Sequence, residues 1–141
     1  MIFMSDVIFI DASALLALAN SSDQYHQRAK QSFTVMLEDK SRFITTNFIL
    51  DEVYTRIKRK AGSLIAINFG ELLKNEKNIK IEWIDKENEK IAWTIFKKYS
   101  DQRFSYTDCT SFAFMKQMKI KKTFCFDGDF KWMGFECIPS E

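Results

Sequence analysis

The sequence predicts an α/β fold built on a mainly parallel sheet, and two observations support this prediction. Short apolar runs at residues 7–10 and 123–126 are typical of strands that are buried on both faces. Between these runs, segments with helical periodicity alternate with other short strands. Each apolar run stops at an aspartate, Asp11 in the first case and Asp127 in the second. Because parallel strands end at one edge of a sheet, both carboxylates should emerge there, where ligands bind in such folds.

The other elements follow in order along the chain. Residues 13–18 predict a short helix, and Asp23 is expected to cap a second helix over residues 24–37. The remaining predicted elements are a strand at 42–46, a helix at 47–60, a helix at 63–74 capped by Ser63, an edge strand at 79–84, a helix at 87–99 capped by Asp85, and a helix at 105–118. The sequence has no internal repeat and no low-complexity linker.

Length and composition favour one folded domain over residues 1–141. The chain is 46% hydrophobic and 28% charged, which is ordinary for a globular protein and excludes wholesale disorder. It contains no apolar stretch of about 20 residues, the length that a transmembrane helix needs. The apolar amino-terminal segment lacks a preceding basic residue and is interrupted by Asp6 and Asp11, unlike a signal peptide. We therefore expect a soluble, cytoplasmic protein.

The cysteines and the net charge add two further expectations. Cys109, Cys125 and Cys137 are odd in number and have no C-x-x-C spacing, so we expect reduced thiols rather than a disulfide framework or a zinc site. The formal net charge is +2. If four acids converge in one pocket, the +2 total less these four negative charges leaves +6 on the rest of the chain, which would attract a polyanion.

Asp11 has two interpretations. It follows the first strand and, like Ser13, could cap the next helix by accepting a hydrogen bond from a free backbone N–H. Alternatively, its carboxylate binds a metal ion at the sheet edge. Asp108 has a similar pair of interpretations, because Ser105 and Asp108 form an S-x-x-D pattern close to a capping box.

Glu52 lies within the apolar face of the helix over 47–60, whereas Asp51 projects about 100° away around that helix and should be solvated. Glu52 could instead pair with Arg56 one turn later, an interaction that contributes a few tenths of a kcal/mol. Taken together, Glu52 and the three aspartates at 11, 108 and 127 form a set of hard oxygen ligands without paired His or Cys. Such a set favours Mg²⁺ or Mn²⁺ over zinc.

Four motifs, in order, make the chain resemble a known family. They are Ile10-Asp11-Ala12-Ser13, Thr45-Thr46-Asn47 followed by Glu52, Ser105-Tyr106-Thr107-Asp108 followed by Ser111-Phe112-Ala113, and Phe126-Asp127-Gly128-Asp129-Phe130. Their order and secondary-structure context resemble those of PIN domains, as found in the VapC-type toxins of toxin–antitoxin pairs. The resemblance covers essentially the whole chain.

This resemblance implies a three-layer α/β/α sandwich with Mg²⁺- or Mn²⁺-dependent endoribonuclease activity. It implies that the catalytic residues are Asp11, Glu52, Asp108 and Asp127, with Asp11, Asp108 and Asp127 as metal ligands. Ser13 matches the family's hydroxyl residue, and Asp129 would be an outer helper of Asp127. The implied partners are an RNA substrate and a protein antitoxin. Pairing with a second copy of the chain, as a homodimer, stays open, and no membrane association is expected.

Two other functions compete with this hypothesis. A PIN-like module that binds RNA or protein without cleaving is disfavoured by the retention of all four acids. A phosphotransferase of the haloacid dehalogenase type needs a second Asp two residues after the first, where this chain has Ser13. The RNA-binding residues cannot be identified from the sequence, because basic residues at helix ends are usually only solvated. The candidates are Arg56, Lys58, Arg59, Lys60, Arg103, Phe104, Lys116, Lys119, Lys121 and Lys122.

Overall fold

The structure, a computed structural model, describes residues 7–140. This part of the chain forms five strands and seven helices. The strands are β1 (Val7–Ile10), β2 (Arg42–Thr46), β3 (Ile79–Glu82), β4 (Lys122–Phe124) and β5 (Glu136–Ile138). The helices are α1 (Ala12–Ala19), α2 (His26–Glu38), α3 (Asn47–Ala61), α4 (Ser63–Asn75), α5 (Lys86–Lys98), α6 (Tyr106–Gln117) and α7 (Asp129–Trp132).

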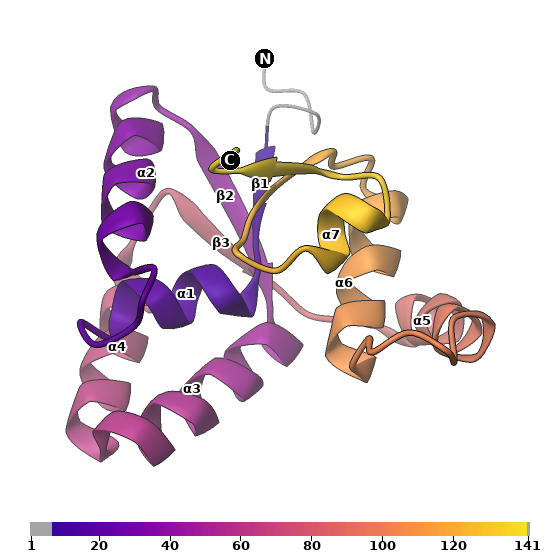
Figure 1. The fold of residues 1–141 in the computed structure, drawn as a ribbon, viewed down its shortest axis with the longest axis horizontal. Coiled ribbons are helices and arrows are strands. Elements are labelled where there is room, and N and C mark those ends of the chain that lie inside the picture. The colour runs from indigo at the N-terminus through magenta and orange to yellow at the C-terminus, as the bar shows by residue number, and fades with distance from the viewer. Residues whose placement is uncertain (1–6, 141) are drawn as a thin grey trace.

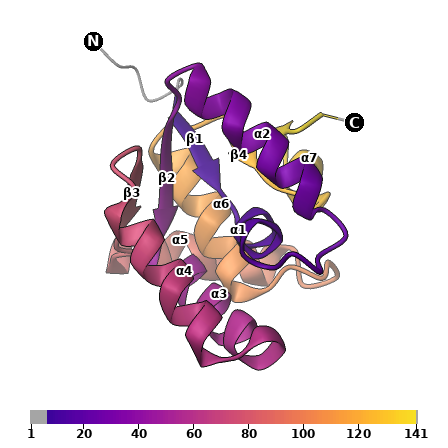
Figure 2. The ribbon, with the colours of Figure 1, turned by 90° about the vertical axis from the view of Figure 1, so that its left-hand side faces the viewer.

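The five strands form one sheet in the order β3-β2-β1-β4-β5, and every neighbouring pair is parallel. Helices α1, α2 and α4 lie on one side of this sheet, and α5, α6 and α7 lie on the other (Figure 1). Figure 2, turned by 90°, shows α1 and α2 in front of β1. The predicted three-layer α/β/α sandwich is therefore confirmed, and so is the edge position of β3.

The strand order reverses at β1. From β1 the chain moves to β2 and then β3, and it later returns past β1 to form β4 and β5. This makes the boundary between β1 and β4 the topological switch point, where the connections leave the sheet on opposite faces. Open α/β sheets bind ligands in the crevice beyond the carboxyl ends of the strands at such a point.

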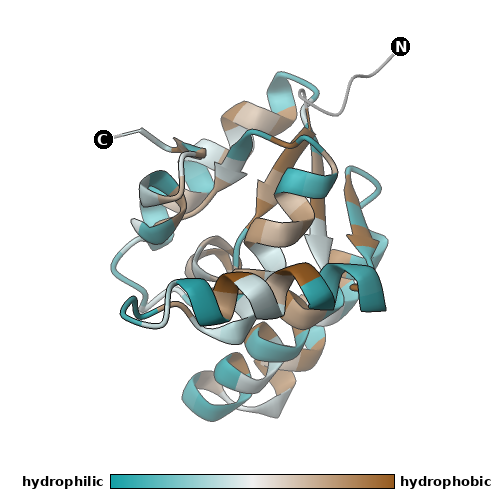
Figure 3. Cartoon of the chain, turned by 90° about the vertical axis from the view of Figure 1, so that its right-hand side faces the viewer, coloured by the Kyte–Doolittle hydropathy of each residue, from teal (hydrophilic) through white to brown (hydrophobic). Residues whose placement is uncertain are grey.

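The core is rich in aromatic residues. All four residues of β1 are buried, and the largest fully buried side chains include Phe9, Phe43, Phe112, Phe124 and Phe130. Hydrophobic residues colour much of the central strands in Figure 3, whereas hydrophilic residues lie along the outer surfaces of the helices. None of the helices within residues 7–140 combines the length and the hydropathy needed to span a bilayer.

Several details differ from the prediction. Helix α7 and strand β5 were not predicted, because elements of four and three residues are too short to show a periodicity. Strand β4 ends at Phe124 rather than residue 126. Ser63 makes no cap bond, since Gly62 occupies the cap position with φ +94°. The Asp23 carboxylate accepts from the Tyr25 N–H at 2.8 Å, one turn before α2 begins at His26.

Candidate metal centre

The two strand ends that were predicted to meet do so. In the register of the neighbouring strands β1 and β4, Ile10 pairs with Phe124. The Asp11 N–H continues this pairing by donating to the Phe124 carbonyl at 3.0 Å. Asp127 follows three residues after the end of β4. Both aspartates therefore lie beyond the carboxyl ends of adjacent strands, at the switch point of the sheet.

Three carboxylates gather at this edge. Asp108, Asp127 and Asp129 each offer one oxygen, and these three oxygens lie within 4.8 Å of one another. Asp108 comes from the first turn of α6, whereas Asp127 and Asp129 flank Gly128 just before α7 and at its start. The group could therefore hold a metal ion. Asp129, expected only as an outer helper, is a full member of it.

The local hydrogen bonds fix two of these side chains. Ser105 Oγ accepts from the Asp108 N–H at 3.0 Å, and Asp108 Oδ2 accepts from the Ser105 N–H at 3.0 Å. This is the capping box that the sequence suggested, so Asp108 caps α6 and also belongs to the acidic group. Asp127 Oδ1 accepts from the Asp129 N–H at 2.9 Å, which orients the short turn between them.

Asp11 is the most buried acid of the site, at 3% exposure. Its Oδ2 accepts from Ser13 Oγ at 2.8 Å and from the Ser13 N–H at 3.2 Å, so Asp11 does cap α1 as the first interpretation held. Burial and the nearby charge of Asp108 nevertheless raise the pKa of Asp11 to about 7. Asp11 therefore lies outside the group of three but within electrostatic reach of it.

The electrostatics of the site are unfavourable without a cation. Burial raises the pKa of Asp108 to about 6, and the charges of Asp127 and Asp129 add to this rise. Burial and the Asp127 charge also raise the pKa of Asp129. Across residues 7–140 the ion pairs are Lys80–Glu82 and Lys90–Glu87, and neither involves these acids. A divalent ion would relieve the repulsion between the carboxylates.

Glu52 is half-buried on α3 and is not a member of the three-carboxylate group. The alternative pair with Arg56 is not formed among the described residues. The first turns of α3 and α6 are adjacent, because the rings of Phe48 and Tyr106 have centroids 6.2 Å apart. Glu52 lies four residues after Phe48 and so on the same face of α3, the face toward the helix that carries Asp108.

Some supporting contacts were not predicted. Thr45 is fully buried at the end of β2, and its hydroxyl donates to the Ile10 carbonyl at 3.0 Å, next to Asp11. Asn47 Oδ1 accepts from the Ile84 N–H at 2.7 Å and so ties the start of α3 to the segment after β3. Short polar residues in the last two positions of a strand and directly after it were the available signal for these contacts.

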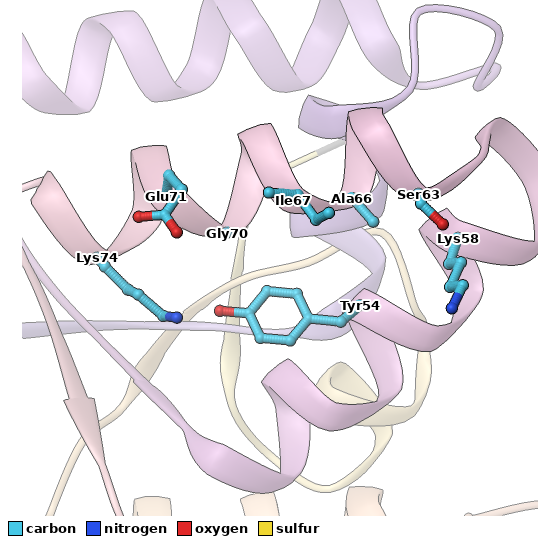
Figure 4. Close-up of a pocket in the computed structure, with 8 residues that line it drawn as sticks. All are labelled: Tyr54, Lys58, Ser63, Ala66, Ile67, Gly70, Glu71 and Lys74. Carbon is cyan, nitrogen blue, oxygen red and sulfur yellow. The ribbon is translucent and has the colours of Figure 1, made fainter.

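A separate pocket of about 290 Å³ lies between α3 and α4, and none of the predicted acids lines it (Figure 4). The Tyr54 ring lies across this pocket, with its hydroxyl toward Lys74 (Figure 4). A Cβ on Gly70 would lie 3.2 Å from that ring, so glycine permits the close approach of the two helices. The pocket therefore reflects the packing of α3 on α4 rather than the acidic site.

Comparisons with known proteins agree with this architecture. The family model for the PIN domain matches residues 8–136. The 23S rRNA-specific endonuclease VapC20 of Mycobacterium tuberculosis, from strains CDC 1551 and H37Rv, is 30% identical over 135 residues. That alignment covers 96% of this chain and all of the relative.

A solved structure is also similar. The crystal structure of Mycobacterium tuberculosis VapC20, described as a Sarcin-Ricin loop cleaving toxin, superposes with a TM-score of 0.81 at 29% identity. The superposition covers 91% of this chain and 95% of that one. The sheet is parallel and has acids at its switch point. The PIN-domain model matches most of the chain, and VapC20 aligns with the chain over its whole length. The chain therefore belongs to the PIN-domain family.

Proposed function

We propose that this protein is a metal-dependent endoribonuclease that hydrolyses RNA phosphodiester bonds and acts as the toxin of a toxin–antitoxin pair. The observation that carries the proposal is the convergence of Asp108, Asp127 and Asp129 beside Asp11 in a PIN domain. The similarity to VapC20, which is named as an RNA endonuclease, supports the same function. A binding module that does not cleave would have no need to retain carboxylates with such raised pKa values.

The residues suit a hard divalent cation. Asp11, Asp108 and Asp127 would provide oxygen ligands for Mg²⁺ or Mn²⁺, and Asp129 would support Asp127 or share its role. Such an ion, when bound, supplies an acidified water and neutralises charge at the phosphate. The raised pKa values fit this assignment, since carboxylates that repel one another in a partly buried site bind a cation favourably.

Asp108, Glu52 and Ser13 would each have a separate role in the reaction. Asp108, at the start of α6, would accept a proton from the attacking water. Glu52 would reach the same site from α3 and hold a second water or the leaving side of the phosphate. The Ser13 hydroxyl would keep the Asp11 carboxylate in a fixed orientation through its 2.8 Å hydrogen bond.

An RNA surface beside the acids is supported by exposed aromatic and basic side chains. Trp132 is 58% exposed and lies three residues after Asp129, on the short helix α7. Its ring packs edge-on against Tyr99 and Phe104, with centroids 5.7 Å away in both cases. Phe104 is followed directly by Ser105, which caps α6 by accepting a hydrogen bond from the Asp108 N–H. Trp132 would thus offer a stacking platform for a base next to the cleaved bond, with Arg103 and Lys131 nearby in sequence.

A protein antitoxin would restrain the nuclease. A cavity of about 620 Å³ lies between the loop after α1 and the end of α3, and its lining includes Asp23, Gln24, Lys60 and Ile65. This is the region between the helices at 24–37 and 47–60 where we expect an antitoxin segment to bind. Helix α4, which carries Ile65, also has exposed apolar side chains at Leu64, Ile67 and Leu72. An apolar antitoxin segment would cover these side chains and direct an Arg or Lys toward the acids.

The decisive experiment incubates the purified protein with a structured hairpin RNA and an unstructured RNA. Each reaction is run with Mg²⁺, with Mn²⁺ and with excess chelator. We expect discrete fragments with metal and intact RNA with chelator. Binding without fragments in every metal would instead identify a non-cleaving module.

A second experiment tests the toxin assignment. Expression of the protein should inhibit growth, and co-expression of the product of the adjacent gene should relieve the inhibition. Ile65→Glu should weaken that relief, whereas Trp93→Glu, on exposed α5 across the sheet, is the matched control. Growth inhibition that the neighbouring gene product leaves unchanged would argue against an antitoxin partner.

A further inference from the structure

Two of the three cysteines lie in contact with one another. The Sγ atoms of Cys125 and Cys137 are 3.4 Å apart. The two residues come from neighbouring strands, since Cys137 is in β5 and Cys125 directly follows β4. The Cys125 N–H donates to the Ile138 carbonyl at 3.1 Å, which holds the two segments side by side. The sequence spacing gave no sign of this pair.

From this geometry we propose that Cys125 and Cys137 form an intramolecular disulfide under peroxide, and that this disulfide inhibits the nuclease. The sulfurs need to approach by only about 1.4 Å, because a disulfide bond is about 2.05 Å long. Among the described residues β5 is an edge strand paired with β4 alone, so β5 and the segment after β4 can share this approach at little cost. The inhibitory part of the proposal rests on the proposed ribonuclease function.

The oxidation balances with hydrogen peroxide as the oxidant. Cys137 is half-buried and Cys125 is 3% exposed, so Cys137 meets the peroxide first. Its sulfur attacks one oxygen, the O–O bond breaks, and a sulfenic acid and one water result. The Cys125 sulfur then attacks the sulfenic sulfur and expels hydroxide, which takes the Cys125 proton and leaves as a second water. The two thiols lose two electrons and the peroxide gains them.

The pair is linked to the acidic site through three consecutive residues. The Cys125 thiol also approaches the Asp127 carbonyl at 3.6 Å, and the disulfide removes the hydrogen that makes this weak contact. Phe126 lies between Cys125 and Asp127 in the sequence, and its N–H donates to Ser13 Oγ. The Ser13 hydroxyl in turn donates to the Asp11 carboxylate. A shift of Cys125 toward β5 therefore displaces Asp127 relative to Asp11. Misplacement of catalytic groups by about 1 Å can cost roughly 100-fold in rate.

The test compares protein treated with peroxide and protein kept in dithiothreitol. Thiol titration after denaturation should fall from three thiols to one, since Cys109 is fully buried in α6 and should stay reduced. RNA cleavage should fall at least tenfold and return when dithiothreitol is added. Cys137→Ser should keep both of its thiols after peroxide and should cleave RNA equally well before and after treatment. Cys109→Ala should respond to peroxide as the unmodified chain does.

Each other outcome rejects part of the proposal. Three thiols after peroxide, or covalent dimers on a non-reducing gel, would overturn the intramolecular disulfide. A disulfide that leaves both cleavage and the Mn²⁺-induced rise of the thermal midpoint unchanged would overturn the inhibition. If even the reduced protein cleaves no RNA, the ribonuclease proposal fails, while the thiol count still decides whether the disulfide forms.

Discussion

Ser13 and Phe126, which are 113 positions apart in the sequence, are joined by a hydrogen bond in which the Phe126 N–H donates to Ser13 Oγ at 2.9 Å. The same hydroxyl donates to Asp11 Oδ2 at 2.8 Å. One oxygen atom therefore connects the first acid of the site to the segment that carries Asp127. Together with the hydrogen bond from the Asp11 N–H to the Phe124 carbonyl, this side chain fixes the segment that carries Asp127 relative to Asp11.

Replacing Ser13 by Ala should therefore affect both stability and activity. The change leaves the Phe126 N–H without its partner and removes a donor to Asp11, which should lower the free energy of unfolding by about 1–3 kcal/mol. RNA cleavage should fall roughly tenfold or more, because Asp11 and Asp127 lose their common anchor. Urea denaturation and a cleavage assay measure the two effects. Ser22→Ala, at an exposed position in the turn after α1, is the control and should change neither.

Asp11→Asn separates the metal-ligand role from the cap. Asn caps a helix about as well as Asp, so the fold should persist while RNA cleavage is abolished. Without metal the variant should be at least as stable as the parent at pH 8, because it lacks a buried charge whose pKa is raised to about 7. Asp51→Asn is the matched control, since Asp51 is exposed on α3. Normal cleavage by the Asp11→Asn protein, or equal damage from both changes, would contradict the assignment.

The raised pKa values predict how the stability of the metal-free protein depends on pH. Between about pH 4 and pH 7 the folded protein keeps protons on Asp11 and Asp108 that the unfolded chain has already released. Stability should therefore fall as the pH rises through this window, by an amount on the order of 3 kcal/mol. Denaturant titrations at pH 5 and pH 8 with chelator present give the measurement. If the metal-free protein instead became more stable toward pH 8, the pKa values of these carboxyls would not be raised in the folded state.

A bound divalent ion should reverse this loss. Mg²⁺ or Mn²⁺ binds the ionised carboxylates of the folded state, so it should stabilise the protein by about 2.7 kcal/mol at a free concentration one hundred times its dissociation constant. The rise in the thermal midpoint should be larger at pH 8 than at pH 5, where the acids are partly protonated. Differential scanning calorimetry with and without metal tests this. An unchanged midpoint in saturating Mg²⁺ and Mn²⁺ would exclude a shared site.

Trp132→Ala tests the proposed stacking platform. Loss of one stacked base costs about 1–3 kcal/mol, so the KM for a short RNA should rise about 5- to 150-fold while kcat changes little. The control is Trp83→Ala, because Trp83 is 76% exposed and follows β3 at the opposite end of the sheet order. Steady-state kinetics on one RNA with both variants measure the difference. Equal KM values for the two variants would argue against a specific role of Trp132.

Much of the acidic site could be predicted because each acid follows a local signal. Asp11 and Asp127 stand at the ends of apolar strands, and Asp108 stands in a capping pattern at a helix start. The sequence favoured Asp127 as the ligand and Asp129 as its helper, but it could not give their distances to Asp108, since both acids flank one glycine and these distances depend on how the turn after β4 folds. The structure brings both to Asp108.

The fold was predictable in its layers but not in its shortest elements or all of its caps. Long amphipathic helices can be predicted from their periodicity, whereas α7 and β5 are too short to show one. These two elements are held to the core in part by Phe130 and Cys137. Capping was predicted correctly at Asp85 and wrongly at Ser63. At the second position the chain turns through Gly62 with a positive φ, and this places the glycine rather than the serine before the helix.

The pairing of the first strand with the fourth has a consequence for synthesis on the ribosome. A nascent chain acquires Asp11 at the beginning and Asp127 and Asp129 near the end, and β4 reaches β1 only after more than a hundred intervening residues have been made. Native contacts of such long sequence separation form late, since the loop-closure entropy must be overcome first. An incomplete chain would therefore carry no assembled acidic group and could not cleave RNA before its synthesis is finished.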